Sequence, residues 1–176
     1  MQIQAGEQYI PSSKKEVYGK IIISVVVLGV VAAFCSRYPA QTGSGWYHQL
    51  RQPSFAPPYW LPFVMWTVVY ILMGWSFGLI WHIARKSSQP GVRQKARKGI
   101  LLFVVHLVFN LIFPVLLIGM QRPRVALADM TILIVLIVIL IPRFYPLSRT
   151  ASCLLIPYLL WILYAAALNV SIVVLN

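Results

Sequence analysis

Long stretches without charge constrain this chain most, because five of them alternate with short segments that carry the lysines and arginines. A helix rises about 1.5 Å per residue and therefore needs about 20 residues to cross a ~30 Å hydrocarbon core. In lipid the backbone must satisfy its own hydrogen bonds, and the stretches lack the alternation typical of strands. We therefore predict an all-α membrane protein, a bundle of five transmembrane helices. The expected helices cover residues 20–37, 62–84, 99–120, 125–142 and 151–175.

The composition excludes an ordinary water-soluble protein. Apolar residues make up 60% of the 176 residues and charged residues 10%, whereas soluble domains carry about 25% charged residues. The net charge of +12 alone would fit a nucleic-acid partner, but the charges lie between apolar stretches, so we expect no nucleic acid. The two cysteines, Cys35 and Cys153, offer neither a disulfide framework nor the spacing of metal ligands.

The segments between the expected helices define the domain organisation. Residues 20–176 form one transmembrane domain, which follows a polar tail at residues 1–19. A loop rich in proline and aromatic residues covers 38–61, and a basic connector covers 85–98. An alternative interpretation takes the first apolar stretch, which follows three lysines, as a signal peptide.

The distribution of lysine and arginine predicts the orientation in the membrane. Of the 15 basic residues, eleven fall on the side of the tail and the connector 85–98, and four on the side of the loop 38–61. Positive charge is retained on the cytoplasmic side, so we expect the loop outside. Two interpretations of the connector stay open: a solvated loop, or a segment that also binds the anionic headgroups of membrane lipids.

Aromatic and amide side chains recur at helical spacing in three of the expected helices. These faces hold Pro62, Trp66, Tyr70, Met73 and Phe77 in the second helix, His106, Asn110 and Phe113 in the third, and Pro157, Trp161, Ala165 and Asn169 in the fifth. Such stripes are typical of the walls of an amphipathic cavity. Flat aromatic surfaces suit a planar or rigid polycyclic ligand that is held by stacking.

Each of these residues also has a structural interpretation. Aromatic stripes in membrane helices often pack or anchor at the interface, and Asn110, Asn169 and His106 fit interhelical hydrogen bonds. Asp129 is the one acid within an expected span, where an ionisable group is a functional candidate. Alternatively, it pairs with Arg122 or with the arginine two residues beyond.

The sequence lacks the common catalytic constellations. It has no Gly-rich phosphate loop, no paired carboxylates and no Cys/His cluster, so no metal site is expected. Three scattered histidines and one embedded acid do not build a nucleophile–base–acid set, which excludes a hydrolytic enzyme. An ion pump or secondary transporter would carry charges at mid-depth and repeated, broken segments, and the sequence has neither.

A small-residue step lies in the second expected helix, where Gly74 and Gly78 form GxxxG. Small residues let membrane helices approach each other closely. The step fits either contact within the chain or a homodimer, and we favour contact within the chain.

Three segments resemble the translocator protein family (TspO/MBR). The first is WYHQLRQPSFAPP at residues 46–58, which continues into the W…VYILMG pattern of residues 66–74 and is similar to the family's WYxxLxKPxWxPP loop and following helix. The second covers FN, FP and ALAD within residues 109–129. The third, PYLLWILYA followed by LN within residues 157–169, is similar to the family's PYxxWxxFAxxLN.

The resemblance implies a five-helix bundle, often homodimeric, with a pocket near the first loop. Family members bind porphyrins, such as protoporphyrin IX or heme, as well as sterols and benzodiazepine-type drugs. The implied ligand-binding residues are Trp66, Tyr70, Asn110, Trp161, Ala165 and Asn169, and the implied lid residues are Trp46, Pro53, Phe55, Pro57 and Pro58. The alternative role of the loop is an aromatic anchor on the lipid headgroups.

We therefore expect a membrane protein that binds porphyrins, with sterol-like lipids as a second ligand class, and that acts in their transport, sequestration or stress-linked regulation. Phe55 stands where the family's loop usually has tryptophan, and Val125 where animal members have one in the drug site, so drug binding is the least expected of its properties. Two alternatives stay open: an enzyme that degrades porphyrin with light and oxygen, assisted by Trp66 and Trp161, and a structural membrane subunit without a small ligand. The expected membrane is a bacterial cell envelope or a mitochondrial outer membrane.

Overall fold

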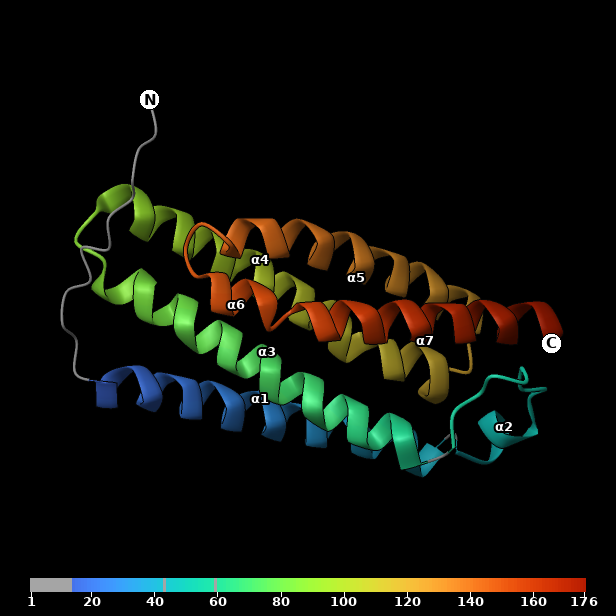
Figure 1. The fold of residues 1–176 in the computed structure, drawn as a ribbon. Helices are drawn as coiled ribbons and strands as arrows, with labels where there is room; N and C mark the ends of the chain where they lie inside the picture. Colours follow the sequence, from blue (N-terminus) through green and yellow to red (C-terminus); the bar gives the residue numbers. More distant parts are fainter. Residues whose placement is uncertain (1–13, 43, 59) are drawn as a thin grey trace.

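The computed structural model describes residues 14–42, 44–58 and 60–176, apart from the side chains at 31, 32, 34–42 and 44. Residues 1–13 of the predicted tail and the side chain of Cys35 lie outside this part of the chain. Every regular element in the described ranges is a helix (Figure 1), which confirms the all-α prediction there. The helices are α1 (Lys14–Thr42), α2 (Ser44–Gln49), α3 (Trp60–Lys86), α4 (Pro90–Pro114), the π-helical η1 (Val115–Gly119), α5 (Pro123–Phe144), α6 (Arg149–Cys153) and α7 (Ile156–Leu175).

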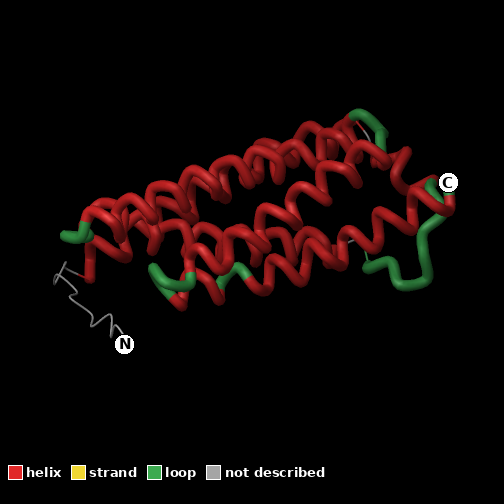
Figure 2. Tube along the Cα trace, turned by 90° about the horizontal axis from the view of Figure 1, so that it is seen from above, coloured by secondary structure: helices red, strands yellow, loops and turns green. Residues whose placement is uncertain are grey.

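Four helical segments are long and apolar enough to cross a membrane. They are Trp60–Lys86, Pro90–Gly119, Pro123–Phe144 and Arg149–Leu175. The first helix, α1, has 29 residues and runs along α3 (Figure 1), and Figure 2 shows the long helices of the bundle from above. The structure therefore accounts for four of the five predicted spans, and α1 is not one of these four.

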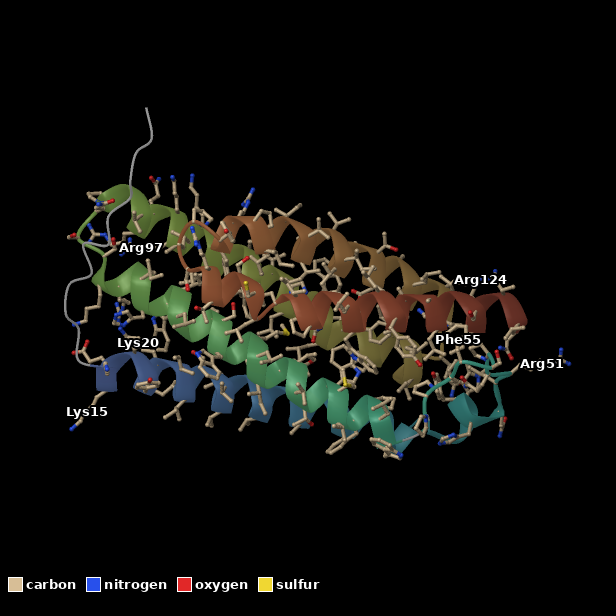
Figure 3. All side chains as sticks on the ribbon, in the orientation of Figure 1. Lys15, Lys20, Arg51, Phe55, Arg97 and Arg124 are labelled. Carbon is tan, nitrogen blue, oxygen red and sulfur yellow. The ribbon has the colours of Figure 1, made fainter. Side chains whose placement is uncertain are left out.

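The long helices run up and down, so the connections gather at two ends of an elongated bundle (Figure 1). We call one the basic end: α1 begins there, and the turns α3–α4 and α5–α6 lie there. Figure 3 shows Lys15, Lys20 and Arg97 at this end. We call the other the loop end, because it holds α2 and the loop 50–58, with Phe55.

Helix α5 illustrates how the sequence builds the interior. Its buried residues follow at steps of three and four, so they form one face of the helix. This face holds Ala126, Asp129, Met130, Leu133, Ile137, Leu140 and Phe144. Between them Val135 and Val138 are half exposed, because the opposite face is turned to the lipid. Van der Waals packing of such faces holds membrane helices together, since lipid provides no hydrophobic drive between them.

The GxxxG step brings α1 against α3. A Cβ atom on Gly74 would lie 2.7 Å from the Cα of Val25, and one on Gly78 would lie 2.6 Å from the Cα of Ile21. Carbon atoms attract optimally at about 3.5–4.0 Å, so any larger residue would push the two backbones apart. The glycines serve contact within the chain, as favoured above.

The boundaries of several helices differ from the predicted ones. Helix α1 begins at Lys14, inside the expected tail, and α4 begins at Pro90 rather than at 99. Most of the connector 85–98 is therefore helical and not a loop. Proline fits the first turn of a helix, and the Arg, Lys, Gln and Ala residues that follow are strong helix formers. The loop 38–61 likewise contains the end of α1 and the short helix α2.

The last span, expected as one helix over 151–175, is broken between α6 and α7. Pro157 has no N–H to continue the hydrogen-bond ladder. The N–H of Leu155 bonds to the carbonyl of Ser152 at 3.1 Å, which leaves the Ala151 carbonyl without its helical partner. The hydroxyl of Ser76 in α3 donates to that carbonyl at 2.7 Å, so the break is stabilised by a neighbouring helix.

Candidate functional site

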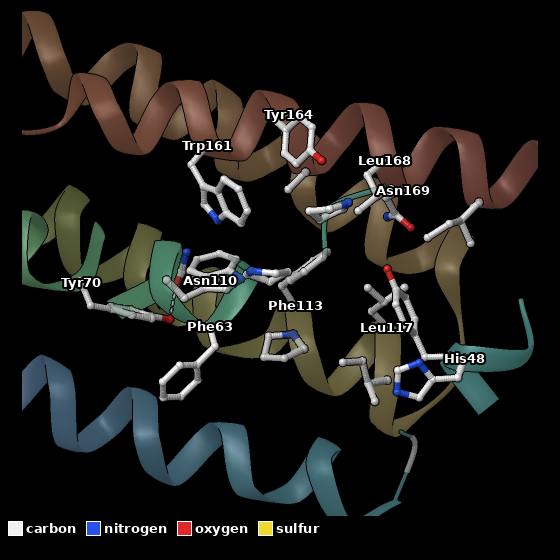
Figure 4. Close-up of a pocket in the computed structure, with 18 residues that line it drawn as sticks. His48, Phe63, Tyr70, Asn110, Phe113, Leu117, Trp161, Tyr164, Leu168 and Asn169 are labelled. Carbon is white, nitrogen blue, oxygen red and sulfur yellow. Dashed lines mark hydrogen bonds between the residues drawn. The ribbon is translucent and has the colours of Figure 1, made fainter. Parts of the chain in front are cut away.

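A cavity of about 380 Å³ lies toward the loop end of the bundle, between α3, α4, η1 and α7 (Figure 4). Ligand pockets commonly measure about 300–1,000 Å³. Most of its wall is apolar or aromatic. The lining residues are Tyr47, His48, Pro57, Pro62, Phe63, Trp66, Tyr70, Asn110, Phe113, Pro114, Leu117, Ile118, Trp161, Tyr164, Ala165, Leu168, Asn169 and Ile172.

All six predicted ligand-binding residues line this one cavity. They are Trp66, Tyr70, Asn110, Trp161, Ala165 and Asn169. Residues four apart lie on the same side of a helix, and the three faces that carry them are turned toward one another in Figure 4. The periodicity of the sequence therefore predicted this part of the wall, whereas Met73, Phe77, His106 and Pro157, which belong to the same predicted faces, do not line the cavity. The role of the six residues in binding stays a prediction.

The aromatic rings of the wall are in contact with one another. The rings of Trp66 and Trp161 meet edge to face with centroids 6.4 Å apart, and Trp66 lies 5.8 Å from Tyr70. On α7 the Trp161 ring lies 5.4 Å from that of Tyr164. Aromatic pairs at these distances contribute about 0.5–1.5 kcal/mol beyond their buried area. The rings therefore hold each other in place and preform the cavity.

The predicted lid residues are more dispersed. Pro57 lines the cavity, whereas Trp46, Pro53, Phe55 and Pro58 do not. Phe55 is 46% exposed, yet its backbone carbonyl accepts a hydrogen bond from the hydroxyl of Tyr164 at 2.9 Å. The loop 50–58 is therefore attached to the cavity wall through the Phe55 carbonyl and through Pro57.

A second attachment joins the loop to the end of α7. The backbone N–H of Arg51 donates to Oδ1 of Asn176 at 2.9 Å, and Nδ2 of Asn176 donates to the Arg51 carbonyl at 3.2 Å. The amide side chain of Asn176 thus pairs with both backbone groups of Arg51. Tyr47 of α2 also lines the cavity, and burial raises the pKa of its hydroxyl. The Tyr47 side chain is therefore neutral at neutral pH.

Sequence reasoning missed several wall residues. Tyr164 and Leu168 follow Trp161 at steps of three and four, so the helical spacing of α7 already contained the signal that would have added them. Tyr47 and His48 come from α2. No periodicity points to them, because a single short turn has no repeating face.

A chain of hydrogen bonds leads from the cavity into the interior. The hydroxyl of Tyr70 donates to Oδ1 of Asn110, and Nδ2 of Asn110 donates to the hydroxyl of Tyr158 at 2.9 Å. The Tyr158 hydroxyl lies 3.0 Å from Nε2 of His106. Because the Tyr158 oxygen already accepts a hydrogen bond from Asn110, the Tyr158 hydroxyl can donate its proton to Nε2 of His106. Asn110 and His106 thus form the interhelical bonds that the structural interpretation expected, and Asn110 also lines the cavity.

Several buried polar side-chain atoms in the described ranges have no hydrogen-bond partner. They are Nε1 of Trp161, Oδ1 of Asn169, Oδ2 of Asp129 and Nδ1 of His106. The alternative interpretation, in which Asp129 pairs with Arg122 or Arg124, is not borne out: within the described ranges the salt bridge joins Lys86 to Glu16, and Oδ2 of Asp129 has no partner. Trp161 and Asn169 line the cavity, although these two unpartnered atoms are themselves buried. Among the residues that the structure describes, no group of His, Cys, Asp and Glu is arranged to hold a metal ion.

These features define a helical membrane protein whose spans enclose an aromatic pocket, and the chain is an integral multi-pass membrane protein. Residues 21–175 match the model of the TspO/MBR family, so the chain belongs to the TspO/MBR family. The resemblance seen in the sequence motifs is thereby confirmed.

The relatives span most of the chain. The chain is 34% identical over 141 residues to the Tryptophan-rich protein TspO of Chlorobaculum tepidum, covering 80% of this chain and 85% of that protein. Identity to the protein of the same name from Archaeoglobus fulgidus is also 34%, over 155 residues that cover 88% and 94% of the two chains. The Translocator protein homolog of Schizosaccharomyces pombe is 36% identical over 130 residues, which cover 74% and 77%.

Proposed function

We propose that this chain binds porphyrins in the cavity between α3, α4 and α7, and that α1 completes a bundle of five transmembrane helices. The observation that carries the binding proposal is the pair of tryptophans, Trp66 and Trp161, whose rings share one enclosed wall. Residues 21–36 of α1 carry no charge, and the helix packs against α3 at Gly74 and Gly78, which supports its position as a span.

The chemistry of the wall favours a flat, largely apolar ligand. Aromatic faces stack on a conjugated ring, and a small number of polar groups fix its orientation. The unpartnered N–H of Trp161 and carbonyl of Asn169, two buried atoms of residues in the wall, are the candidates for those groups here. Protoporphyrin IX or heme has the required flat shape, and a sterol-like lipid with its single hydroxyl is the second ligand class.

The proposed role is transport, sequestration or stress-linked regulation of such ligands within a membrane. No step of this proposal depends on a resident cofactor. A bacterial envelope or a mitochondrial outer membrane remains the expected host membrane, and a homodimer remains an expectation that rests on the family resemblance.

A second candidate is light- and oxygen-dependent breakdown of porphyrin. The observation that favours it is the contact between the Trp66 and Trp161 rings at the cavity wall, since two indoles next to a photoexcited ligand are oxidisable groups. In this case the cavity serves as a reaction chamber and not only as a binding site.

A titration of purified protein with protoporphyrin IX, first in the dark and then under illumination, tests both candidates. We expect a shifted porphyrin absorption band in the dark and a loss of about 1–3 kcal/mol of binding free energy in Trp66→Ala or Trp161→Ala, by analogy with base–aromatic stacking. Trp75→Ala is the matched control, because Trp75 lies on α3 outside the cavity and is 41% exposed.

The outcomes separate the alternatives. Equal losses in the three variants would rule out this cavity as the binding site. A new absorption band that grows under light and is absent in the two cavity variants would favour the enzyme. The absence of any spectral shift or ligand-dependent change in melting temperature would favour a structural subunit.

A further inference from the structure

Four oxidisable rings of the cavity wall contact one another in a continuous series, which we call the ring chain. The Trp66 ring lies 5.8 Å from that of Tyr70 and 6.4 Å from that of Trp161, measured between centroids. Trp161 and Tyr164 are neighbours on α7 in Figure 4, with ring centroids 5.4 Å apart. All four residues line the cavity. A ligand in the cavity therefore lies against rings that are in contact from Tyr70 to Tyr164.

The ring chain has the composition of an electron-transfer path. Indole and phenol rings give up an electron more readily than other aromatic side chains, and an electron passes quickly between rings at contact distance. When one ring of the chain is oxidised, a neighbouring ring can therefore supply the missing electron. The oxidised state comes to rest on a ring that can also release a proton, because a neutral radical is more stable than a cation radical.

Two members of the ring chain lack an acceptor for that proton. Nε1 of Trp161 is buried and has no hydrogen-bond partner. The hydroxyl of Tyr70 donates to Oδ1 of Asn110, which is also buried, and an amide oxygen accepts a hydrogen bond but is a very weak base. Oxidation of either ring therefore leaves a positive charge in an apolar wall, where an unpaired charge is costly.

The hydroxyl of Tyr164 points instead to the exposed loop. It donates to the carbonyl of Phe55 at 2.9 Å, and this loop carries the exposed polar residues Arg51, Gln52 and Ser54. Such side chains place the loop in water, which takes up a proton released beside it. The next ring, that of Phe55, lies 6.3 Å from the Tyr164 ring, and phenylalanine is far harder to oxidise. The ring chain therefore ends at Tyr164.

We propose that Tyr164 is the terminal electron donor of the cavity. When light oxidises a bound porphyrin, Trp161 reduces the porphyrin and Tyr164 in turn reduces Trp161. This inference rests on the proposed binding of porphyrin. It adds a redox activity that preserves the ligand instead of degrading it.

Each step of the proposed reaction transfers one electron. The photoexcited porphyrin gives an electron to dioxygen, which becomes superoxide. Trp161 returns an electron to the oxidised porphyrin, and Tyr164 returns one to the oxidised Trp161. The Tyr164 hydroxyl releases its proton to water. In sum, Tyr164 and dioxygen become a neutral tyrosyl radical, superoxide and a proton, and the porphyrin is restored.

The test uses the full chain in detergent, saturated with protoporphyrin IX and illuminated in the presence of dioxygen. Electron paramagnetic resonance of samples frozen under light detects the radical, and growth on ring-deuterated tyrosine narrows the signal of a tyrosyl radical and so identifies it. We expect this signal in wild type and its loss in Tyr164→Phe. Saturation with porphyrin is required because Tyr164→Phe also removes the bond to the loop. The variant is expected to fold, since the family pattern PYxxWxxFAxxLN has phenylalanine at this position.

Three further variants define the path. Trp161→Phe keeps a ring but interrupts the ring chain, so we expect the tyrosyl signal to be lost. Tyr145→Phe is the matched control, because Tyr145 is 52% exposed and lies outside the cavity, and the signal should persist. Tyr70→Phe compares the two ends of the ring chain and should also keep the signal. Mass spectrometry of illuminated Tyr164→Phe should show a severalfold increase in oxidised tryptophan at Trp161.

The outcomes keep the two proposals apart. Absence of a porphyrin absorption shift in the dark would overturn the binding proposal, and the redox proposal with it. Binding in the dark without a tyrosyl signal in the light would overturn the redox proposal alone. The redox proposal would also be wrong if the signal persisted in Tyr164→Phe or Trp161→Phe, or if Tyr70→Phe abolished it.

Discussion

The hydroxyl of Tyr164 in α7 donates a hydrogen bond to the backbone carbonyl of Phe55 at 2.9 Å, and the two rings meet edge to face with centroids 6.3 Å apart. Tyr164 also lines the aromatic cavity. One side chain thus belongs to the wall and at the same time holds the loop 50–58 beside it. Opening of the loop must break this contact.

Tyr164→Phe should accelerate ligand release. The substitution keeps the ring and removes only the hydroxyl, so it deletes one hydrogen bond worth about 0.5–1.5 kcal/mol. We expect release of protoporphyrin IX to be about two- to tenfold faster, with little change in capture, because affinity differences fall mostly on dissociation. Stopped-flow fluorescence measures both rates. Tyr145→Phe is the control, because Tyr145 follows the end of α5 at the basic end of the bundle. An unchanged release rate in Tyr164→Phe would show that the loop serves only as an anchor on the headgroups.

Gly74→Ala should destabilise the protein. The new Cβ would meet the Cα of Val25 at 2.7 Å, and overpacking of this kind costs about 1–3 kcal/mol. Gly91→Ala is the matched control, since a Cβ there meets no atom within 4 Å. Melting temperatures of monomeric protein in detergent should fall for the first variant and not for the second. A change confined to the oligomer distribution on a sizing column would contradict packing within the chain.

Tyr158→Phe should also destabilise the protein, although Tyr158 does not line the cavity. It is fully buried, and loss of its hydroxyl leaves Nδ2 of Asn110 and Nε2 of His106 without this partner. A buried polar group left unsatisfied costs about 1–3 kcal/mol. Unfolding monitored by circular dichroism in a denaturing detergent series would measure the loss. A variant as stable as wild type would show that water replaces the hydroxyl.

Glu16 should give a small, pH-dependent contribution to stability. The hydrogen bond and the charge of Lys86 hold the pKa of this exposed carboxyl below its usual value. A depressed pKa in the folded state stabilises above the unfolded pKa, and this stabilisation is lost as the pH falls through the folded pKa. Glu16→Gln should therefore be slightly less stable than wild type at neutral pH and equally stable in strong acid. Melting curves over pH, repeated in high salt that screens the pair, provide the check.

Features that repeat with the period of a helix were predictable from the sequence. The six cavity residues are one example, because Trp66 with Tyr70, and Trp161 with Ala165 and Asn169, had to share a face once their segments were helices. The stretches without charge likewise predicted the four spans that the structure identifies, since a chain segment in lipid satisfies its own backbone hydrogen bonds as a helix.

Features that depend on proline or on a distant partner were not predictable. The sequence pattern treats residues 151–175 as continuous, but the helix breaks before Pro157. Ser76, 75 residues from Ala151, donates to the Ala151 carbonyl that the break leaves without a helical partner. Pro90 acts in the opposite sense, because it begins a helix where a basic loop was expected. The contact of α2 with the cavity was not predictable either, because the position of this six-residue helix depends on the helices that it packs against.

The π-helical segment η1 is the place where the length of the span Pro90–Gly119 can vary among related sequences. The N–H of Met120 bonds to the carbonyl of Val115, five residues back, at 2.7 Å, so this turn holds one residue more than an α-helical turn. Removal of a single residue between 115 and 119 would convert the turn to α-helix while Asn110 before it and Pro123 after it keep their facing. Insertions and deletions in the span Pro90–Gly119 are therefore expected to concentrate at this turn, where a change in length keeps Asn110 in place and alters only the part of the cavity wall that Leu117 and Ile118 provide.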